Sequence, residues 1–122
     1  MTPADEPLFR EIDAPAGRVD GTVVLLNGGF MTTASWEPLA RSLAECCRVV
    51  RCDFRGQLRS PGQVREELAG NVGDLVALLD GLDSAIDGGI EPVHLLGTSF
   101  GGEIALLLAA RHPERVASLV AV

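Results

Sequence analysis

The sequence predicts an α/β fold with a mostly parallel sheet and helices on both faces. Short apolar runs occur without polar alternation, as is typical of strands buried on both sides. Segments with apolar residues at helical spacing separate these runs, and regular strand–helix alternation favours parallel strands joined by right-handed crossovers. With 122 residues, 47% of them hydrophobic, the chain is expected to form a single domain over residues 1–122 with one core.

The first half of the chain supplies a tail, two strands and a helix. Residues 1–7 are expected to be a loose tail, and residues 8–14 a short edge strand. Residues 21–27 form a continuous apolar run ending in two glycines, which predicts a buried strand. A helix is predicted over residues 33–45, because its apolar residues share one face and Pro38 fits a first turn.

The middle of the chain is predicted to form a strand, a loop and a long helix. Residues 47–53 are predicted to form the next strand. The glycines and proline of residues 55–63 indicate a loop. The longest helical pattern covers residues 64–82, and a Gly-containing connection follows over residues 83–91.

The last third is predicted to be strand, helix and strand. Residues 92–96 are apolar and precede a glycine-rich turn. Residues 100–111 predict an apolar helix that ends before a His-Pro pair. Residues 115–122 predict a final strand, and an apolar edge strand there would invite pairing with further chain.

The turn before the last helix is the main functional signal. Residues 97–101 read Gly-Thr-Ser-Phe-Gly, a Gly-x-Ser-x-Gly pattern between a predicted strand and helix. This context makes Ser99 a candidate nucleophile on a sharp turn, for which Gly97 and Gly101 give room because they lack a Cβ. The N–H of Phe100, at the start of a helix, would favour the negative charge of a tetrahedral intermediate.

Two other interpretations of the turn stay open. It could be a packing turn of an unrelated α/β fold. A phosphate-binding loop is less favoured, because no Lys follows the glycines and the pattern is not Gly-x-Gly-x-x-Gly.

Residues 20–122 resemble the N-terminal portion, through strand 6, of the α/β-hydrolase fold family. Besides the elbow, three segments agree in order: residues 24–29 followed by Trp36, residues 53–60 and residues 111–116. The resemblance implies a partial α/β-hydrolase fold in which the N–H of Gly29, beside Phe30, completes an oxyanion hole with Phe100.

The sequence departs from the family pattern at two positions. Asn27 stands where the family usually has a loop-bracing His, and 3-oxoadipate enol-lactonases are similar in having Asn there. Leu58 replaces a family Gly in the loop after the second buried strand, which could alter that loop.

A base for Ser99 is not predicted within the chain. The family orders its triad as Ser, acid and His, and the last two follow strand 6. The two histidines are His94, in the strand below the serine, and His112, a helix length or roughly 18 Å away. The carboxylates of Asp53 and Glu103 are expected to be loop-bracing or solvated groups.

These observations favour a serine hydrolase acting on an ester, thioester or lactone carbonyl of a small molecule. The chain alone is expected to be incomplete and inactive. Acid and base would come from a carboxyl-terminal half, or from a partner chain that pairs with the edge strand at residues 116–122. A non-catalytic binding or assembly module, and an acyltransferase or C–C-bond enzyme of the same fold, remain alternatives.

Composition narrows the class of partner and the location. A net charge of −7 argues against binding to nucleic acid or to an anionic membrane surface. No apolar run approaches the ~20 residues of a membrane helix, and the acidic N-terminus does not read as a signal peptide, so a cytoplasmic location is expected.

The cysteines predict neither a disulfide framework nor a metal cluster. Cys46 and Cys47 are adjacent, and Cys52 lies in a strand-like run where a buried thiol is expected. We expect no cofactor and no metal.

Overall fold

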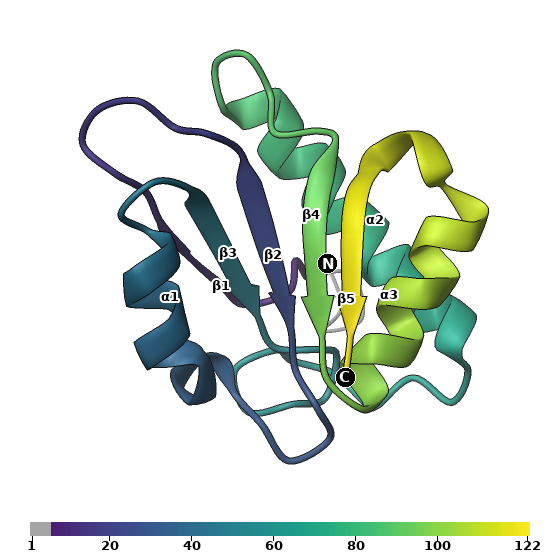
Figure 1. Ribbon diagram of the computed structural model, residues 1–122. Coiled ribbons are helices and arrows are strands. Elements are labelled where there is room, and N and C mark those ends of the chain that lie inside the picture. The colour runs from purple at the N-terminus through teal and green to yellow at the C-terminus, as the bar shows by residue number, and fades with distance from the viewer. Residues whose placement is uncertain (1–5) are drawn as a thin grey trace.

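The computed structural model describes residues 6–122, which form a five-stranded sheet in the order β1-β3-β2-β4-β5 (Figure 1). The edge strand β1 runs antiparallel to β3, and the other neighbours pair in parallel. The mostly parallel sheet predicted from the sequence is therefore confirmed. The strands are β1 (Arg10–Asp13), β2 (Thr22–Leu26), β3 (Arg48–Cys52), β4 (Val93–Gly97) and β5 (Val116–Ala121).

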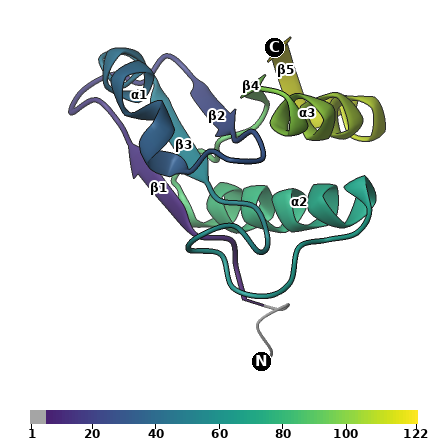
Figure 2. The ribbon, with the colours of Figure 1, turned by 90° about the horizontal axis from the view of Figure 1, so that it is seen from below.

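Helices cover both faces of the sheet, as predicted (Figure 2). On one face, Ala40 of α1 (Glu37–Leu43) and Trp36, which directly precedes this helix, pack against Leu25 and Val49 of the sheet. On the other face, α2 (Leu68–Ala85) and α3 (Phe100–Arg111) bury the larger apolar cluster. The central strands β2, β3 and β4 alternate their buried residues between these two clusters, which explains their largely apolar sequences.

Two predicted helices begin later than their sequence patterns indicate. The segment predicted as helical from residue 33 starts with the 3₁₀ turn η2 (Thr33–Trp36). The segment predicted from residue 64 becomes helical at Leu68 and continues to Ala85. Val64 packs instead against the preceding loop, where a Cβ at Gly56 would lie 2.6 Å from the Val64 nitrogen.

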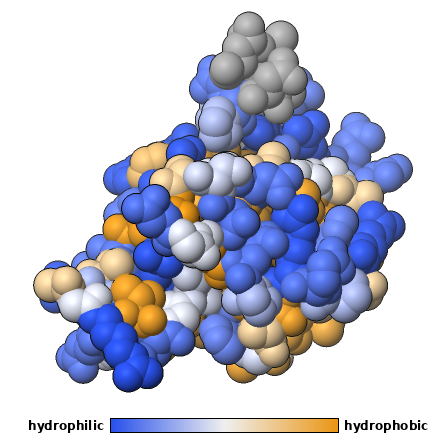
Figure 3. Space-filling model, turned by 90° about the horizontal axis from the view of Figure 1, so that it is seen from above, coloured by the Kyte–Doolittle hydropathy of each residue, from blue (hydrophilic) through white to orange (hydrophobic). Residues whose placement is uncertain are grey.

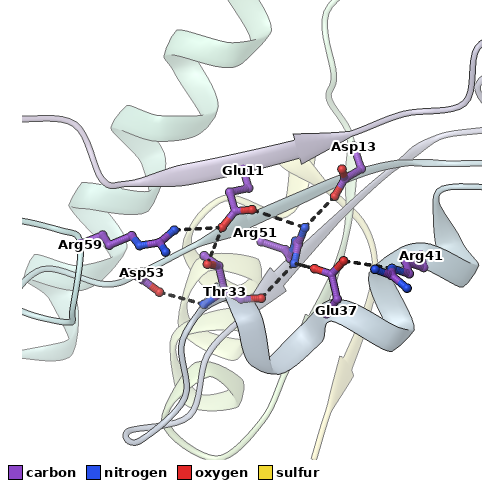
Figure 4. Close-up of polar contacts among 8 residues, drawn as sticks. All are labelled: Glu11, Asp13, Thr33, Glu37, Arg41, Arg51, Asp53 and Arg59. Carbon is purple, nitrogen blue, oxygen red and sulfur yellow. Dashed lines mark hydrogen bonds and ion pairs between the residues drawn. The ribbon is translucent and has the colours of Figure 1, made fainter.

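A charged network ties the two strands at one edge to the start of α1 (Figure 4). The buried Arg51 of β3 forms ion pairs with Asp13 at 2.9 Å and with Glu37 at 2.8 Å. It also donates a hydrogen bond to the Thr33 carbonyl. Because this single guanidinium contacts β1, η2 and α1, it fixes the position of η2 and α1 against the sheet.

Figure 3 shows the end of the molecule that carries the amino ends of the parallel strands, and hydrophilic residues cover most of it. Within residues 6–122, no helix combines the length and apolar character that crossing a membrane requires. Cys52 is fully buried, as predicted, and desolvation raises the pKa of its thiol to about 12.

Two aspartates are expected to make the fold sensitive to acid. Asp83 accepts hydrogen bonds from the N–H groups of Ile90 and Glu91, which lowers the pKa of its carboxyl. Burial opposes ionisation of Asp74, but hydrogen bonds from Arg65 and Arg55 outweigh that effect and lower its pKa. The stabilisation that these two carboxylates give the fold is complete above the ordinary carboxyl pKa of about 4. It is lost as the pH falls through their lower pKa values in the folded protein.

We therefore expect the urea concentration at the unfolding midpoint to decrease as the pH is lowered below about 4. An Asp83→Asn variant should lose less stability over that range, because an amide oxygen can still accept both N–H groups and does not titrate. Urea unfolding of both proteins between pH 7 and pH 3 measures the difference. If both proteins lost the same amount of stability between pH 7 and pH 3, the role given to Asp83 would be contradicted.

Candidate active site

Ser99 lies between the end of β4 and the first residue of α3, with its side chain exposed. Its φ of 52° and ψ of −117° make it the one non-glycine residue within 6–122 that has a positive φ. Such a conformation costs on the order of 1–3 kcal/mol and persists only where the surroundings enforce it. The turn thus holds a serine in a strained position at the carboxyl end of the sheet.

The glycines on either side of Ser99 permit a very close approach of backbone segments. A Cβ on Gly97 would overlap the Gly101 carbonyl and lie 2.7 Å from the nitrogen of Gly102. A Cβ on Gly101 would overlap the Leu26 carbonyl and lie 2.6 Å from the oxygen of Asn27. The backbone atoms they meet belong to the sheet and to α3, so neither position has room for a side chain.

Backbone hydrogen bonds hold the turn from both neighbouring strands. The N–H of Thr98 donates to the Leu26 carbonyl of β2 at 3.3 Å. On the other side, the N–H of Ser99 donates to the Val122 carbonyl at 2.7 Å, and the N–H of Val122 donates to Gly97 at 2.9 Å. The geometry at Ser99 therefore depends on the strand that follows α3.

Both backbone N–H groups that the sequence nominates for an oxyanion are without a hydrogen-bond partner in the part of the chain that the structure describes. They belong to Gly29, in the turn after β2, and to Phe100, the first residue of α3. Both residues line one small pocket of about 190 Å³. The structure thus places Gly29 and Phe100, the two residues whose N–H groups the sequence nominates, on one pocket. The other lining residues are Phe54, Arg55, Gln57, Val64 and Asn71.

A buried polar network braces the loops around this pocket. Asn27 accepts a hydrogen bond from the indole of Trp36 at 2.8 Å and donates to Asp53 at 3.0 Å. Asp53 also accepts the N–H of Thr33 at 3.1 Å, which joins this network to the Arg51 network (Figure 4). These contacts give Asn27 and Asp53 a bracing position between the loops that follow β2 and β3.

Arg55 pairs with a carboxylate that is distant in sequence. Arg55 forms its ion pair with Asp74 of α2, at 3.3 Å, rather than with Asp53. It also donates to the Pro61 carbonyl at 3.1 Å. Both charges of the Arg55–Asp74 pair are more than nine-tenths buried, so the pair fixes the loop after β3 against α2.

Both histidines lie away from Ser99, as predicted. The ring of His94 is 2.6 Å from the hydroxyl of Ser118 and packs beside Gly21, at the amino end of the sheet. His112 follows the last residue of α3, so a helix of roughly 18 Å separates it from Ser99. Neither imidazole reaches the serine within hydrogen-bond distance.

Sequence reasoning missed Gln57 and Asn71, which line the pocket. Gln57 lies in a stretch whose glycines and proline indicate only a loop. Its side chain crosses to the turn after β2 and donates to the Gly28 carbonyl at 3.2 Å. The usable signal was position alone, since ligands bind at the carboxyl ends of parallel strands and Gln57 closely follows one.

Residues 21–122 match the family described as alpha/beta hydrolase fold. The chain belongs to the α/β hydrolase fold family. The sheet order, the antiparallel edge strand and the strand–turn–helix at Ser99 are the features of this chain that agree with the family resemblance.

Curated relatives in the family bear the names of hydrolases. RutD of Variovorax paradoxus (strain S110), which carries a carbamate hydrolase name, is 38% identical over 120 residues, or 95% of this chain and 42% of RutD. The pimeloyl-[acyl-carrier protein] methyl ester esterase of Aeromonas hydrophila is 37% identical over 82% of this chain and 36% of the esterase. The chain thus spans less than half the length of these relatives.

Solved structures of hydrolases are similar in fold. An enol-lactonase from Burkholderia xenovorans LB400 superposes with a TM-score of 0.79 at 29% identity, covering 92% of this chain and 41% of the enol-lactonase. A marine microorganism esterase superposes with a TM-score of 0.82 over 94% of this chain and 41% of its own. At 24% identity, that second likeness concerns the fold alone.

Proposed function

We propose that this chain is the nucleophile-bearing portion of a serine hydrolase that acts on an ester, thioester or lactone carbonyl of a small molecule. The observation that carries the proposal is the strained, exposed Ser99 at the start of α3, close to two N–H groups without partners. A serine held at such cost, at the carboxyl end of a parallel sheet, is typical of a functional site.

The reaction would begin with attack of the Ser99 oxygen on the carbonyl carbon while a base takes the hydroxyl proton. The carbonyl π electrons move to oxygen, and the N–H groups of Gly29 and Phe100 would stabilise that oxyanion. Collapse of the intermediate expels the protonated alcohol, thiol or enol and leaves an acyl ester on Ser99. Water, deprotonated by the same base, then releases the acid and restores the serine.

The histidine base and the acidic residue that completes the triad would come from a polypeptide segment that pairs with β5. Val120 of this edge strand and Val122, directly after it, are 54% and 79% exposed, although both are apolar. A further parallel strand would cover them and satisfy the free edge. Because the chain spans less than half of the relatives' lengths, a carboxyl-terminal continuation is the occupant that we propose.

The names of the relatives support hydrolysis over acyl transfer. They include a carbamate hydrolase, a methyl ester esterase and an enol-lactonase, all of which act on an acyl carbonyl bonded to a heteroatom. The non-catalytic alternative has one observation in its favour, which is that neither histidine of the chain reaches Ser99.

A fusion protein tests the proposal. Residues 1–122 are joined to the part of Variovorax paradoxus RutD that follows the matched segment, and hydrolysis of p-nitrophenyl butyrate is followed for the fusion and for residues 1–122 alone. We expect steady turnover from the folded fusion and none above background from the chain alone. A folded fusion without turnover would favour the non-catalytic module. Full activity of residues 1–122 alone would contradict the inference that this chain lacks the base that activates Ser99.

A further inference from the structure

The side-chain amide of Gln57 is held on three sides. Its Oε1 accepts the N–H of Phe54 at 2.8 Å and the amide of Asn27 at 3.3 Å. The backbone N–H of Gln57 donates to the Phe54 carbonyl at 2.8 Å, which fixes the backbone from which this side chain extends. These bonds fix the rotamer, so the Nε2 group is aimed at the Gly28 carbonyl, to which it donates at 3.2 Å.

The Gly28 carbonyl receives a second hydrogen bond, from the N–H of Met31 at 3.1 Å. Two donors on one oxygen fix the plane of the Gly28–Gly29 peptide. In a trans peptide the carbonyl and the following N–H point in opposite directions. The N–H of Gly29 is therefore directed away from Gln57 and Met31.

The turn after β2 lies against the serine turn. A Cβ on Gly28 would lie 3.5 Å from the Thr98 carbonyl, so the turn after β2 packs directly on the residue before Ser99. The N–H of Gly29 has no partner within residues 6–122. Gly29, Gln57 and Phe100 line the same pocket.

We propose that Gln57 is a positioning residue of the oxyanion site: by holding the Gly28 carbonyl, it orients the Gly29 N–H for a developing oxyanion. The inference rests on the proposed function of Ser99. In this proposal, the Gln57 side chain sets the direction of the Gly29 N–H dipole. Stabilisation of transition-state charge depends on that direction. Asn27 acts one step further away, by donating to the Gln57 amide, and Asp53 acts through Asn27, from which it accepts a hydrogen bond.

The first test uses NMR spectroscopy of the 122-residue chain and needs no catalysis. Gln57→Met removes the donor at similar size, and Gln57→Glu keeps an oxygen for Phe54 and Asn27 but cannot donate when ionised. Both variants should move the carbonyl ¹³C resonance of Gly28 upfield and shift the Gly29 amide, with the Gly97 carbonyl unchanged. Leu58→Ala, in the same loop with its side chain 76% exposed, is the matched control and should change neither resonance.

The second test separates positioning from simple bracing. In the fusion described above, Gln57→Met should lower kcat on the order of tenfold with little change in KM, a part of the 10²–10³ lost when an oxyanion donor is removed outright. An unchanged Gly28 resonance, or an unchanged kcat, would overturn the proposal for Gln57 while leaving Ser99 as the nucleophile. Turnover that is unaffected by loss of Ser99 would instead overturn the proposed function.

Discussion

Replacing Gly101 by alanine is expected to lower the free energy of unfolding by about 3 kcal/mol, at the upper end of what overpacking costs. The added Cβ would overlap the Leu26 carbonyl and lie 2.6 Å from that of Asn27. Both are backbone atoms at the end of a buried central strand, so they cannot move aside as a flexible side chain would. Relief requires α3 to shift away from the sheet, which would open the core at Ile104 and Leu108.

Gly81→Ala is the matched control for this substitution. Gly81 lies within α2, and a Cβ there would meet nothing within 4 Å. Alanine is the better helix former, so this variant should be as stable as the wild type or more stable by about 0.5–1 kcal/mol. Urea unfolding of the two variants measures the contrast. Equal stabilities would show that close backbone approach does not require glycine at position 101.

Replacing Ser99 by glycine is expected to separate stability from activity. Glycine adopts a positive φ without steric cost, so the variant should gain about 1 kcal/mol of unfolding free energy. In the fusion with the carboxyl-terminal part of RutD, the same change removes the attacking oxygen. Hydrolysis of p-nitrophenyl butyrate should fall by about 10³-fold or more, since nucleophile deletions in serine hydrolases cost this much or more.

Ser118→Gly serves as the comparison for this variant. Ser118 is an exposed serine on β5, and its hydroxyl contacts His94 rather than the pocket. Glycine within a strand is unfavourable, so Ser118→Gly should lose stability but keep turnover. If Ser99→Gly also lost stability, the positive φ would not be a source of strain. If it kept turnover, Ser99 would not be the nucleophile.

The order of strands and helices could be predicted from the sequence, because β2, β3, β4 and β5 are short, largely apolar runs and glycine or proline marks most changes of element. The serine turn could be predicted for the same reason, since its signal is local. The start of α2 could not. Residues 64–67 have a helical sequence pattern, but contact between Val64 and the loop at Gly56 holds them out of the helix.

Contacts between loops far apart in sequence were also outside the reach of the sequence. Gln57 reaches Gly28 across 29 positions, and Arg55 pairs with Asp74 rather than with its near neighbour Asp53. No periodicity or turn signal encodes which of two carboxylates an arginine meets. The sequence did indicate that its histidines cannot serve Ser99, because strand and helix geometry alone places them too far away.

A covalent label on Ser99 tests the central claim most directly. In an activated serine, the oxygen displaces fluoride from a fluorophosphonate and forms a stable phosphonate ester. Intact-mass and peptide mass spectrometry of the treated fusion should show one adduct per chain, on the peptide that contains Ser99, and none on the Ser99→Gly variant. A folded, hydrolytically active fusion that takes up no label at Ser99, or whose variant is labelled equally, would contradict the account.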